Sequence, residues 1–158
     1  MSKAFTSEET ADAPEVVAPR APLPPGVPNY VTARGLAQLR AELVALLAEP
    51  AAKERSAAHT QRRVALEARI ATAELVAPSR HDVDVVRFGA TVAVAGPGGP
   101  RRYRIVGVDE ADPAQGSIAF TSPLARALLG RSVGDSVRVR APRGDERLEI
   151  ESVEYPAG

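Results

Sequence analysis

The sequence contains no cysteine, no tryptophan and only two histidines, His59 and His81. Without cysteine the chain cannot form disulfides, Cys-ligated zinc sites or a thiol nucleophile. Two histidines leave little room for a His-rich metal site or a Ser-His-Asp triad. We therefore expect no catalytic residue, no metal and no other cofactor, and the composition argues against an enzyme.

Long hydrophobic runs and aromatic residues are scarce too. No apolar run approaches the ~20 residues needed to span a bilayer, and no signal-peptide core follows Met1. Three Phe and three Tyr in 158 residues are too few to line a large ligand cavity. Lys plus Arg and Asp plus Glu balance at 20 each, which gives no basis for direct sequence-specific binding of nucleic acid. The sequence thus predicts a cytoplasmic protein of one or two small domains without membrane contact.

Proline is abundant, above all near the N-terminus. Six of the 14 prolines lie at or before Pro28. Each proline removes an amide donor and fixes φ, so neither a helix nor a central strand is expected there. We predict a disordered, partly polyproline-II tail over residues 1–29, acting as a linker rather than as a ligand for an aromatic groove.

Residues 30–78 have the pattern of an antiparallel coiled-coil hairpin. Thr32 is a plausible N-cap, and leucines follow it at spacings of 3, 4 and 3, which is typical of a coiled-coil seam: Leu36, Leu39, Leu43 and Leu46. A second helical pattern runs from about Lys53 to Val76, before Pro78. Two short helices of this kind each need an apolar partner, and the nearest partner is the other helix.

Residues 79–158 change to a period of two, which predicts an α+β domain. Strands are expected over 88–95, 101–108, 117–122, 136–142 and 146–155, with one short helix that begins at Pro123 and stops at Gly130. Asp109, Glu110 and Asp112 cluster in a loop of this domain. Their spacing is not that of a calcium loop, so we expect a solvated loop or surface electrostatics.

Several stretches, in this order along the chain, resemble the bacterial Gre transcript-cleavage factors: NYVTARGLAQLRAEL (29–43), RRVALEARIATAELVAP (62–78), FGATV (88–92), YRIVGVDEAD (103–112), SPLARALLG (122–130) and VGDSVRVRAPRG (133–144). The shortened hairpin is also similar to that of Rnk-type regulators. The resemblance implies an FKBP-like C-terminal domain of antiparallel strands. It also implies a partner, RNA polymerase, at the rim of the secondary channel in the largest subunit. The implied contact residues are Thr121, Ser122, Pro123, Leu124 and Arg126.

The tip of the hairpin departs from that family. Gre factors carry acidic residues at the tip, which help hold a second metal ion at the polymerase centre. Here the stretch PAAKERSAAHTQ (50–61) contains one acid, Glu54, between Lys53 and Arg55. By eye about a dozen residues are missing from each arm, or ~18 Å of reach. We therefore expect no stimulation of transcript cleavage.

Four residues around the shortened tip remain candidates for contacts: Arg55, His59, Arg62 and Arg63. They either meet an acidic surface, a phosphate or a nucleotide near the channel mouth, or they form a solvated helical face, which we favour. The resulting hypothesis is a non-catalytic transcription regulator that binds RNA polymerase. The alternatives are an FKBP-like peptidyl-prolyl isomerase, which the few aromatic residues disfavour, and a Rnk-like adaptor for another protein.

Overall fold

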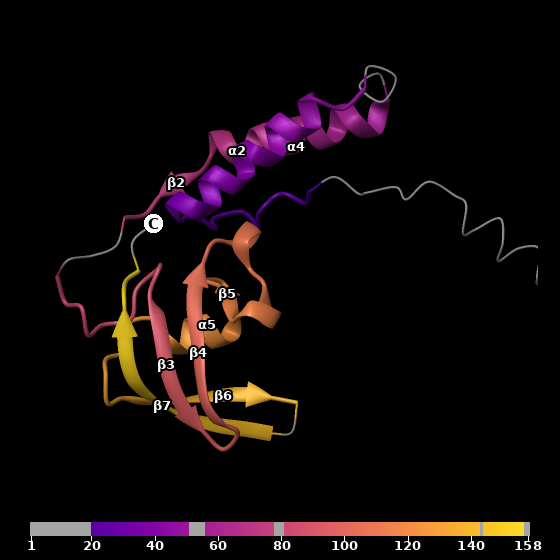
Figure 1. Cartoon of the computed structure of the whole chain (residues 1–158). Coiled ribbons are helices and arrows are strands. Elements are labelled where there is room, and N and C mark those ends of the chain that lie inside the picture. Colours follow the sequence, from indigo (N-terminus) through magenta and orange to yellow (C-terminus); the bar gives the residue numbers. More distant parts are fainter. Residues whose placement is uncertain (1–19, 51–55, 78–80, 143, 157–158) are drawn as a thin grey trace, which may run out of the picture.

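The computed structural model describes residues 20–50, 56–77, 81–142 and 144–156 as a helical hairpin placed across one end of a sheet domain (Figure 1). Both parts were predicted, and the α+β class is confirmed. In the described parts of the chain, no helix is both long and apolar enough to cross a membrane.

The hairpin consists of two helices of 15 residues each, α2 (Ala33–Leu47) and α4 (Ala57–Ala71). Thr32 caps α2 as predicted, because its side chain accepts a hydrogen bond from the Gly35 amide. Ser56 caps α4 in the same way through the His59 amide. At 1.5 Å per residue each helix is about 22 Å long.

The predicted leucine seam joins the helices. Leu39 and Leu46 of α2 are buried together with Leu66 of α4, and Leu36, Leu43 and Ile70 pack partly buried around them. The spacing of 3 and 4 residues therefore does place these side chains along one stripe.

The second helix is shorter than its pattern predicts, because α4 ends at Ala71 rather than near Val76. Residues Glu74–Leu75 form strand β2, which pairs in parallel with β1 (Tyr30–Val31). The backbone amides of Glu74 and Val76 donate to the carbonyls of Asn29 and Val31, at 2.8 and 3.1 Å. These tertiary hydrogen bonds outweigh the weak helical preference of the segment.

Five strands form the sheet domain, in the spatial order β5-β4-β3-β7-β6. Their bounds are β3 (Thr91–Gly96), β4 (Gly99–Val106), β5 (Ser117–Ala119), β6 (Ser136–Ala141) and β7 (Gly144–Glu154). All neighbouring pairs are antiparallel except β4 and β5, so the expectation of a purely antiparallel sheet is wrong at this edge. Two 3₁₀ turns, η1 (Val108–Glu110) and η2 (Pro113–Gln115), carry the chain from β4 back to the start of β5.

Helix α5 (Pro123–Leu128) covers part of one face of this sheet. Its buried residues Ala125 and Leu128 join Val92, Ile105 and Ile150 in the hydrophobic core of the sheet domain. The alternation of buried and less buried residues along β3 and β7 is the period of two read from the sequence.

Candidate functional site

The segment from Thr121 to Arg126 is the predicted contact surface, and its backbone is held by a helix cap and by the hydrophobic core. Ser122 is the N-cap of α5, and its hydroxyl accepts a hydrogen bond from the Ala125 amide at 3.3 Å. Pro123 occupies the first turn, where its missing N–H costs nothing. Ala125 is fully buried, while Pro123 and Arg126 are exposed and Leu124 is half-buried. Packing of α5 against the core therefore fixes the position of its exposed side, which we call the presented side.

A groove of about 350 Å³ lies beside Pro123 and Leu124. Arg101, Tyr103 and Val139 contribute to its other walls, from strands that α5 does not cover completely. Arg101 lies 3.7 Å from Glu146, and the neighbouring Tyr103 hydroxyl raises the pKa of Arg101. The groove therefore combines three arginines and one acid with apolar side chains, which suits a contact with a protein segment.

At the tip, His59 was expected either to contact a partner or to lie on a solvated helical face. It does neither, since it is buried between the two helices. Its Nε2 lies 2.9 Å from the Leu46 carbonyl oxygen, which makes Nε2 the donor of a hydrogen bond across the hairpin. The same carbonyl also accepts from the Glu49 amide at 3.2 Å, so the bond from His59 is an additional link that holds the two helices together at this end.

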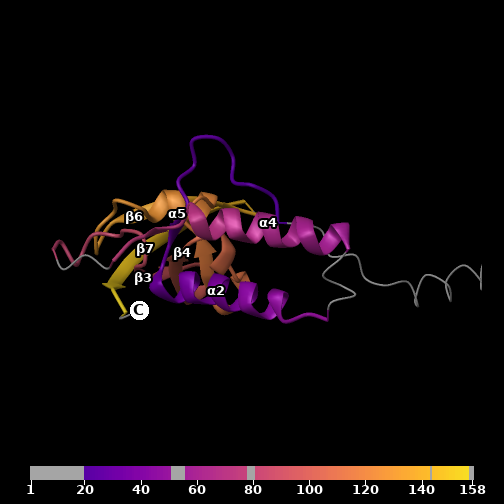
Figure 2. The same ribbon diagram turned by 90° about the horizontal axis from the view of Figure 1, so that it is seen from above.

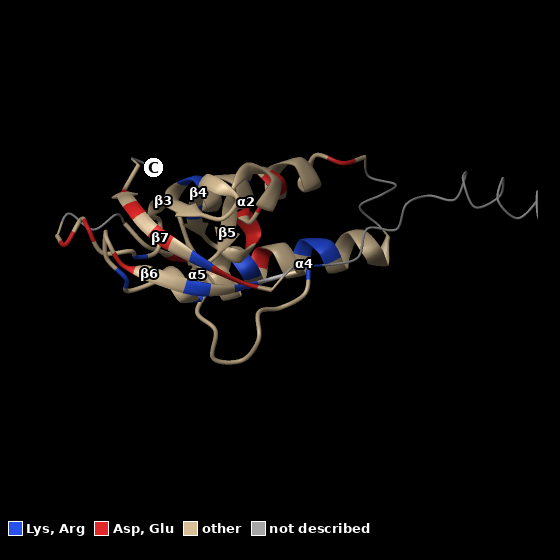
Figure 3. Ribbon diagram, turned by 90° about the horizontal axis from the view of Figure 1, so that it is seen from below, with Lys and Arg blue, Asp and Glu red and all other residues tan. Residues whose placement is uncertain are grey.

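The remaining described charges at the tip are paired within the hairpin. Arg62 lies 3.7 Å from Glu49, and Glu49 is also 3.7 Å from His59. Arg63 pairs with Glu67 one turn along α4, at 3.7 Å. Arg55, like Glu54, lies outside the described residues. Figure 3 shows basic and acidic residues mixed along α4 and β7 rather than sorted by sign.

Nothing at the described part of the tip resembles a metal site. Among residues 20–50, 56–77, 81–142 and 144–156, no three His, Asp or Glu side chains gather closely enough to hold a metal ion. Glu49 is the described carboxylate nearest the end of α2, and its two neighbours Arg62 and His59 are donors, not further ligands.

The loop 109–112 was expected to be solvated or to act through surface electrostatics; Asp112 is exposed, but Asp109 and Glu110 are drawn into contacts with the hairpin. Glu110 lies against the N-terminus of α2, where the Thr32 hydroxyl donates to its Oε1 at 2.6 Å. A Cβ at Gly35 would stand 2.4 Å from the Glu110 Cδ, so glycine is needed there for the carboxylate to approach. Since the N-terminus of a helix carries a partial positive charge, the carboxylate stabilises it. Thr32 thus couples the sheet domain to the first helix.

Asp109, the neighbouring carboxylate, holds the second helix and the segment before the hairpin. Its Oδ2 lies 3.4 Å from NH1 of Arg69 in α4, and its Oδ1 lies 2.9 Å from Nε of Arg20. The Arg69 side chain is only 6% exposed and that of Asp109 only 11%. A buried guanidinium needs a carboxylate partner, so this pair is required where the hairpin meets the sheet domain. We call this contact region the joint.

Three aromatic rings complete the joint between the hairpin and the sheet domain. Tyr30 lies with its ring centre 5.8 Å from that of Phe88 and 5.3 Å from that of Phe120. Close by, a Cβ at Gly107 would stand 2.5 Å from the Tyr30 carbonyl oxygen. Glycine at this position therefore allows the backbones of residues 30 and 107 to approach closely. Sequence patterns indicated none of these contacts, because they join residues far apart in the chain.

Three comparisons relate the chain to known proteins. A family model described as "Transcription elongation factor, GreA/GreB, C-term" matches residues 80–155. The transcription elongation factor GreA of Anaeromyxobacter sp. (strain K) is 50% identical over 108 residues, which are 66% of this chain and 64% of that protein. This chain therefore spans just under two thirds of that relative. GreA of Hyphomonas neptunium is 38% identical over 130 residues, covering 81% of this chain and 83% of that one. The solved GreA/GreB factor of Nitrosomonas europaea is 25% identical, covering 80% of this chain and 98% of that one, with a TM-score of 0.44.

Proposed function

Because this chain belongs to the GreA/GreB family of transcription elongation factors, we propose that it binds RNA polymerase through its sheet domain and regulates elongation without stimulating transcript cleavage. The contact would be made by Thr121, Ser122, Pro123, Leu124 and Arg126 with the rim of the secondary channel in the largest subunit. The hairpin would then lie at the channel entrance, where it occludes the channel or competes with cleavage-competent factors.

The observation that carries this proposal is the chemistry at the described end of the hairpin. A cleavage factor must bring carboxylates to the polymerase metal on a long rigid arm. The arm here has helices of 15 residues, and its carboxylate Glu49 lies within 3.7 Å of both Arg62 and His59. The charged Arg62 beside this carboxylate opposes the approach of a further cation, and about 22 Å of helix limits how far the carboxylate can be carried.

The isomerase alternative loses support from the positions of the aromatic side chains. Such an enzyme needs an apolar, aromatic-walled pocket around the substrate proline. Phe88 and Phe120 do line a pocket of about 650 Å³, but they share it with Tyr30, whose ring packs against both in the contact between hairpin and sheet domain. The Tyr155 hydroxyl donates to the Val85 carbonyl. Tyr103 is the one aromatic residue that lines the groove beside α5. We therefore retain the polymerase-binding proposal alone.

The docking proposal is tested by co-precipitation of core RNA polymerase with purified variants. Ser122→Asp places a charge on the presented surface while keeping a residue that caps helices well, and Pro123→Ala removes the exposed ring. We expect each variant to bind at least about tenfold more weakly, the effect of losing ~1.4 kcal/mol of contact. Arg102→Ala is the matched control, since Arg102 is exposed on β4 and pairs only with Glu154 among the described residues.

Unchanged binding of both docking variants would show that the segment 121–126 is not the contact with RNA polymerase. Loss of binding in the Arg102→Ala control as well would show that the effect is not specific to α5. Thermal unfolding of each variant shows whether the domain is still folded.

A further inference from the structure

Residues 20–29 precede the hairpin and were expected to belong to a disordered tail, yet they make specific contacts at both ends. Figure 2 shows them as a loop on the outer side of α4. At the C-terminal end of this segment, Asn29 donates from Nδ2 to the Arg69 carbonyl at 2.8 Å and to Oγ1 of Thr72 at 3.1 Å. These bonds fasten the segment to the last turn of α4. We call residues 20–29 the strap.

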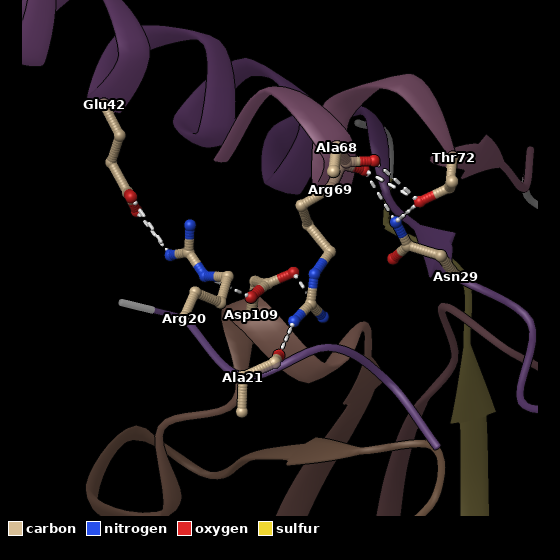
Figure 4. A network of polar contacts seen from close by, with 8 residues as sticks. All are labelled: Arg20, Ala21, Asn29, Glu42, Ala68, Arg69, Thr72 and Asp109. Carbon is tan, nitrogen blue, oxygen red and sulfur yellow. Dashed lines mark hydrogen bonds and ion pairs between the residues drawn. The ribbon is translucent and has the colours of Figure 1, made fainter. Parts of the chain in front are cut away.

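At its other end the strap is held by one guanidinium that contacts two elements. Arg20 lies 2.9 Å from Oδ1 of Asp109 in η1, and its NH2 lies 3.0 Å from Oε2 of Glu42 in α2. The Arg20 side chain is 26% exposed. Figure 4 shows Arg20 between the helices and the sheet domain, with both carboxylates directed toward it. The planar fork of arginine suits two acceptors in different directions, which a lysine could not satisfy equally.

Arg69 closes the arrangement into a ring. Its NH1 lies 3.4 Å from Oδ2 of Asp109, and its NH2 donates to the carbonyl of Ala21 in the strap. Strap, α4 and η1 are thus each bonded to the other two, and Arg20 adds α2 through Glu42 (Figure 4).

We propose that the strap is an interdomain lock that fixes the direction of the helical hairpin relative to the sheet domain, with Arg20 as the residue that closes it. The covalent connection between the two parts runs through residues 76–81 alone. The strap contacts join both helices to η1 and add to the contacts of Thr32 with Glu110 and of Tyr30 with Phe88, so they further oppose rotation about that connection. Four prolines lie within the strap, namely Pro22, Pro24, Pro25 and Pro28. They restrict φ before the strap is fastened, which lowers the entropy lost when its ends are held.

The lock has a consequence that rests on the proposed function. If the presented side of α5 binds the polymerase, the strap determines where the hairpin points from that anchor. The lock itself does not depend on any partner, and it is tested on the free protein.

The absence of cysteine makes the test direct, because two introduced cysteines can carry spin labels without side reactions. Val44→Cys places one label on α2, where the side chain is 68% exposed, and Glu151→Cys places the other on β7. Pulsed electron paramagnetic resonance then gives the distribution of distances between the hairpin and the sheet domain in the full chain.

We expect a narrow distribution in the otherwise unchanged chain and one roughly twice as wide after Arg20→Ala, because the ion pairs of Arg20 are lost. Arg20→Lys keeps the charge but not the fork, so its width should be intermediate. Arg102→Ala removes an ion pair between β4 and β7 that involves no residue of the strap, and it should leave the width unchanged. About 1 M salt should widen the unchanged chain toward the Arg20→Ala result, since these pairs are partly exposed.

An equally narrow distribution after Arg20→Ala, with circular dichroism showing intact helices, would overturn the lock. Failure of the unchanged chain to bind polymerase would overturn the proposed function and leave the label distances as they are. The two proposals can therefore fail separately.

Discussion

The two ends of the helical hairpin use charge in opposite ways. At the base, Asp109 and Glu110 of the sheet domain are drawn into the joint, where they hold Arg69 and the Thr32 cap. At the tip, Glu49 lies partly exposed and is paired loosely, at 3.7 Å, with Arg62. The carboxylates that are held most firmly are therefore those that orient the arm, not those at its far end.

This difference has a functional meaning for a member of the Gre family. An arm that delivers metal ligands needs free carboxylates at its end, whereas an arm that fills or guards a channel needs a fixed direction. The described contacts favour the second design.

The largest effect is expected at the base, from Asp109→Asn. The amide keeps the volume of the side chain but removes the charge that faces Arg69, whose side chain is 6% exposed. Breaking one side of a buried pair should lower the free energy of unfolding by about 3 kcal/mol. Urea unfolding measures this directly.

Glu49→Gln is the matched change at the tip. Its side chain is 27% exposed and its partners are 3.7 Å away, so the loss should stay below about 1 kcal/mol. An equal decrease in the free energy of unfolding for Asp109→Asn and Glu49→Gln would contradict the proposed difference between base and tip.

The sequence predicted those features that depend on neighbours along the chain. The Thr32 cap, the leucine stripe with Leu39 and Leu46, and the Pro123 start of α5 follow from local spacing and from the chemistry of helix ends. The change of period near residue 90 likewise indicated the sheet domain.

The joint could not be predicted in this way. Whether Asp109 faces solvent or Arg69 depends on how the hairpin lies on the sheet, and no local pattern records that angle. His59 looked like one more polar residue of a solvated face, because a single histidine carries no sign of the carbonyl opposite it. The strap was misjudged for a related reason, since prolines exclude helix and strand but do not exclude tertiary contacts.

A loss of stability between those of Asp109→Asn and Glu49→Gln is expected from His59→Ala. The substitution removes the hydrogen bond to the Leu46 carbonyl and leaves a cavity between the helices. Together these should cost about 2 kcal/mol. Hydrogen exchange should become faster for amides near the end of α2 and the start of α4, while the amides of β3 and β7 stay protected. Uniformly faster exchange in both parts would mean that His59 supports more than the tip.

Another small effect concerns Tyr155, which fastens the end of β7 to residue Val85 after the hairpin. Burial raises the pKa of the Tyr155 hydroxyl above its ordinary value of 10.0. The folded state therefore holds this proton more tightly than the unfolded state. The resulting stabilisation is complete below about pH 10 and is lost as the pH rises through the raised pKa.

Tyr155→Phe removes that contribution and should cost about 1 kcal/mol at pH 8. The difference in unfolding free energy between the two proteins should shrink above pH 10. A difference that stays constant between pH 8 and pH 11 would show that the Tyr155 hydroxyl does not titrate differently in the folded protein.

The central claim is that the hairpin of this protein reaches RNA polymerase without supplying metal ligands. The most direct test is a cleavage assay on backtracked elongation complexes with Mg²⁺, at a protein concentration that saturates co-precipitation, beside a cleavage-competent Gre factor as positive control. We predict that the RNA shortens no faster than with polymerase alone. RNA cleavage well above that intrinsic rate would contradict the account.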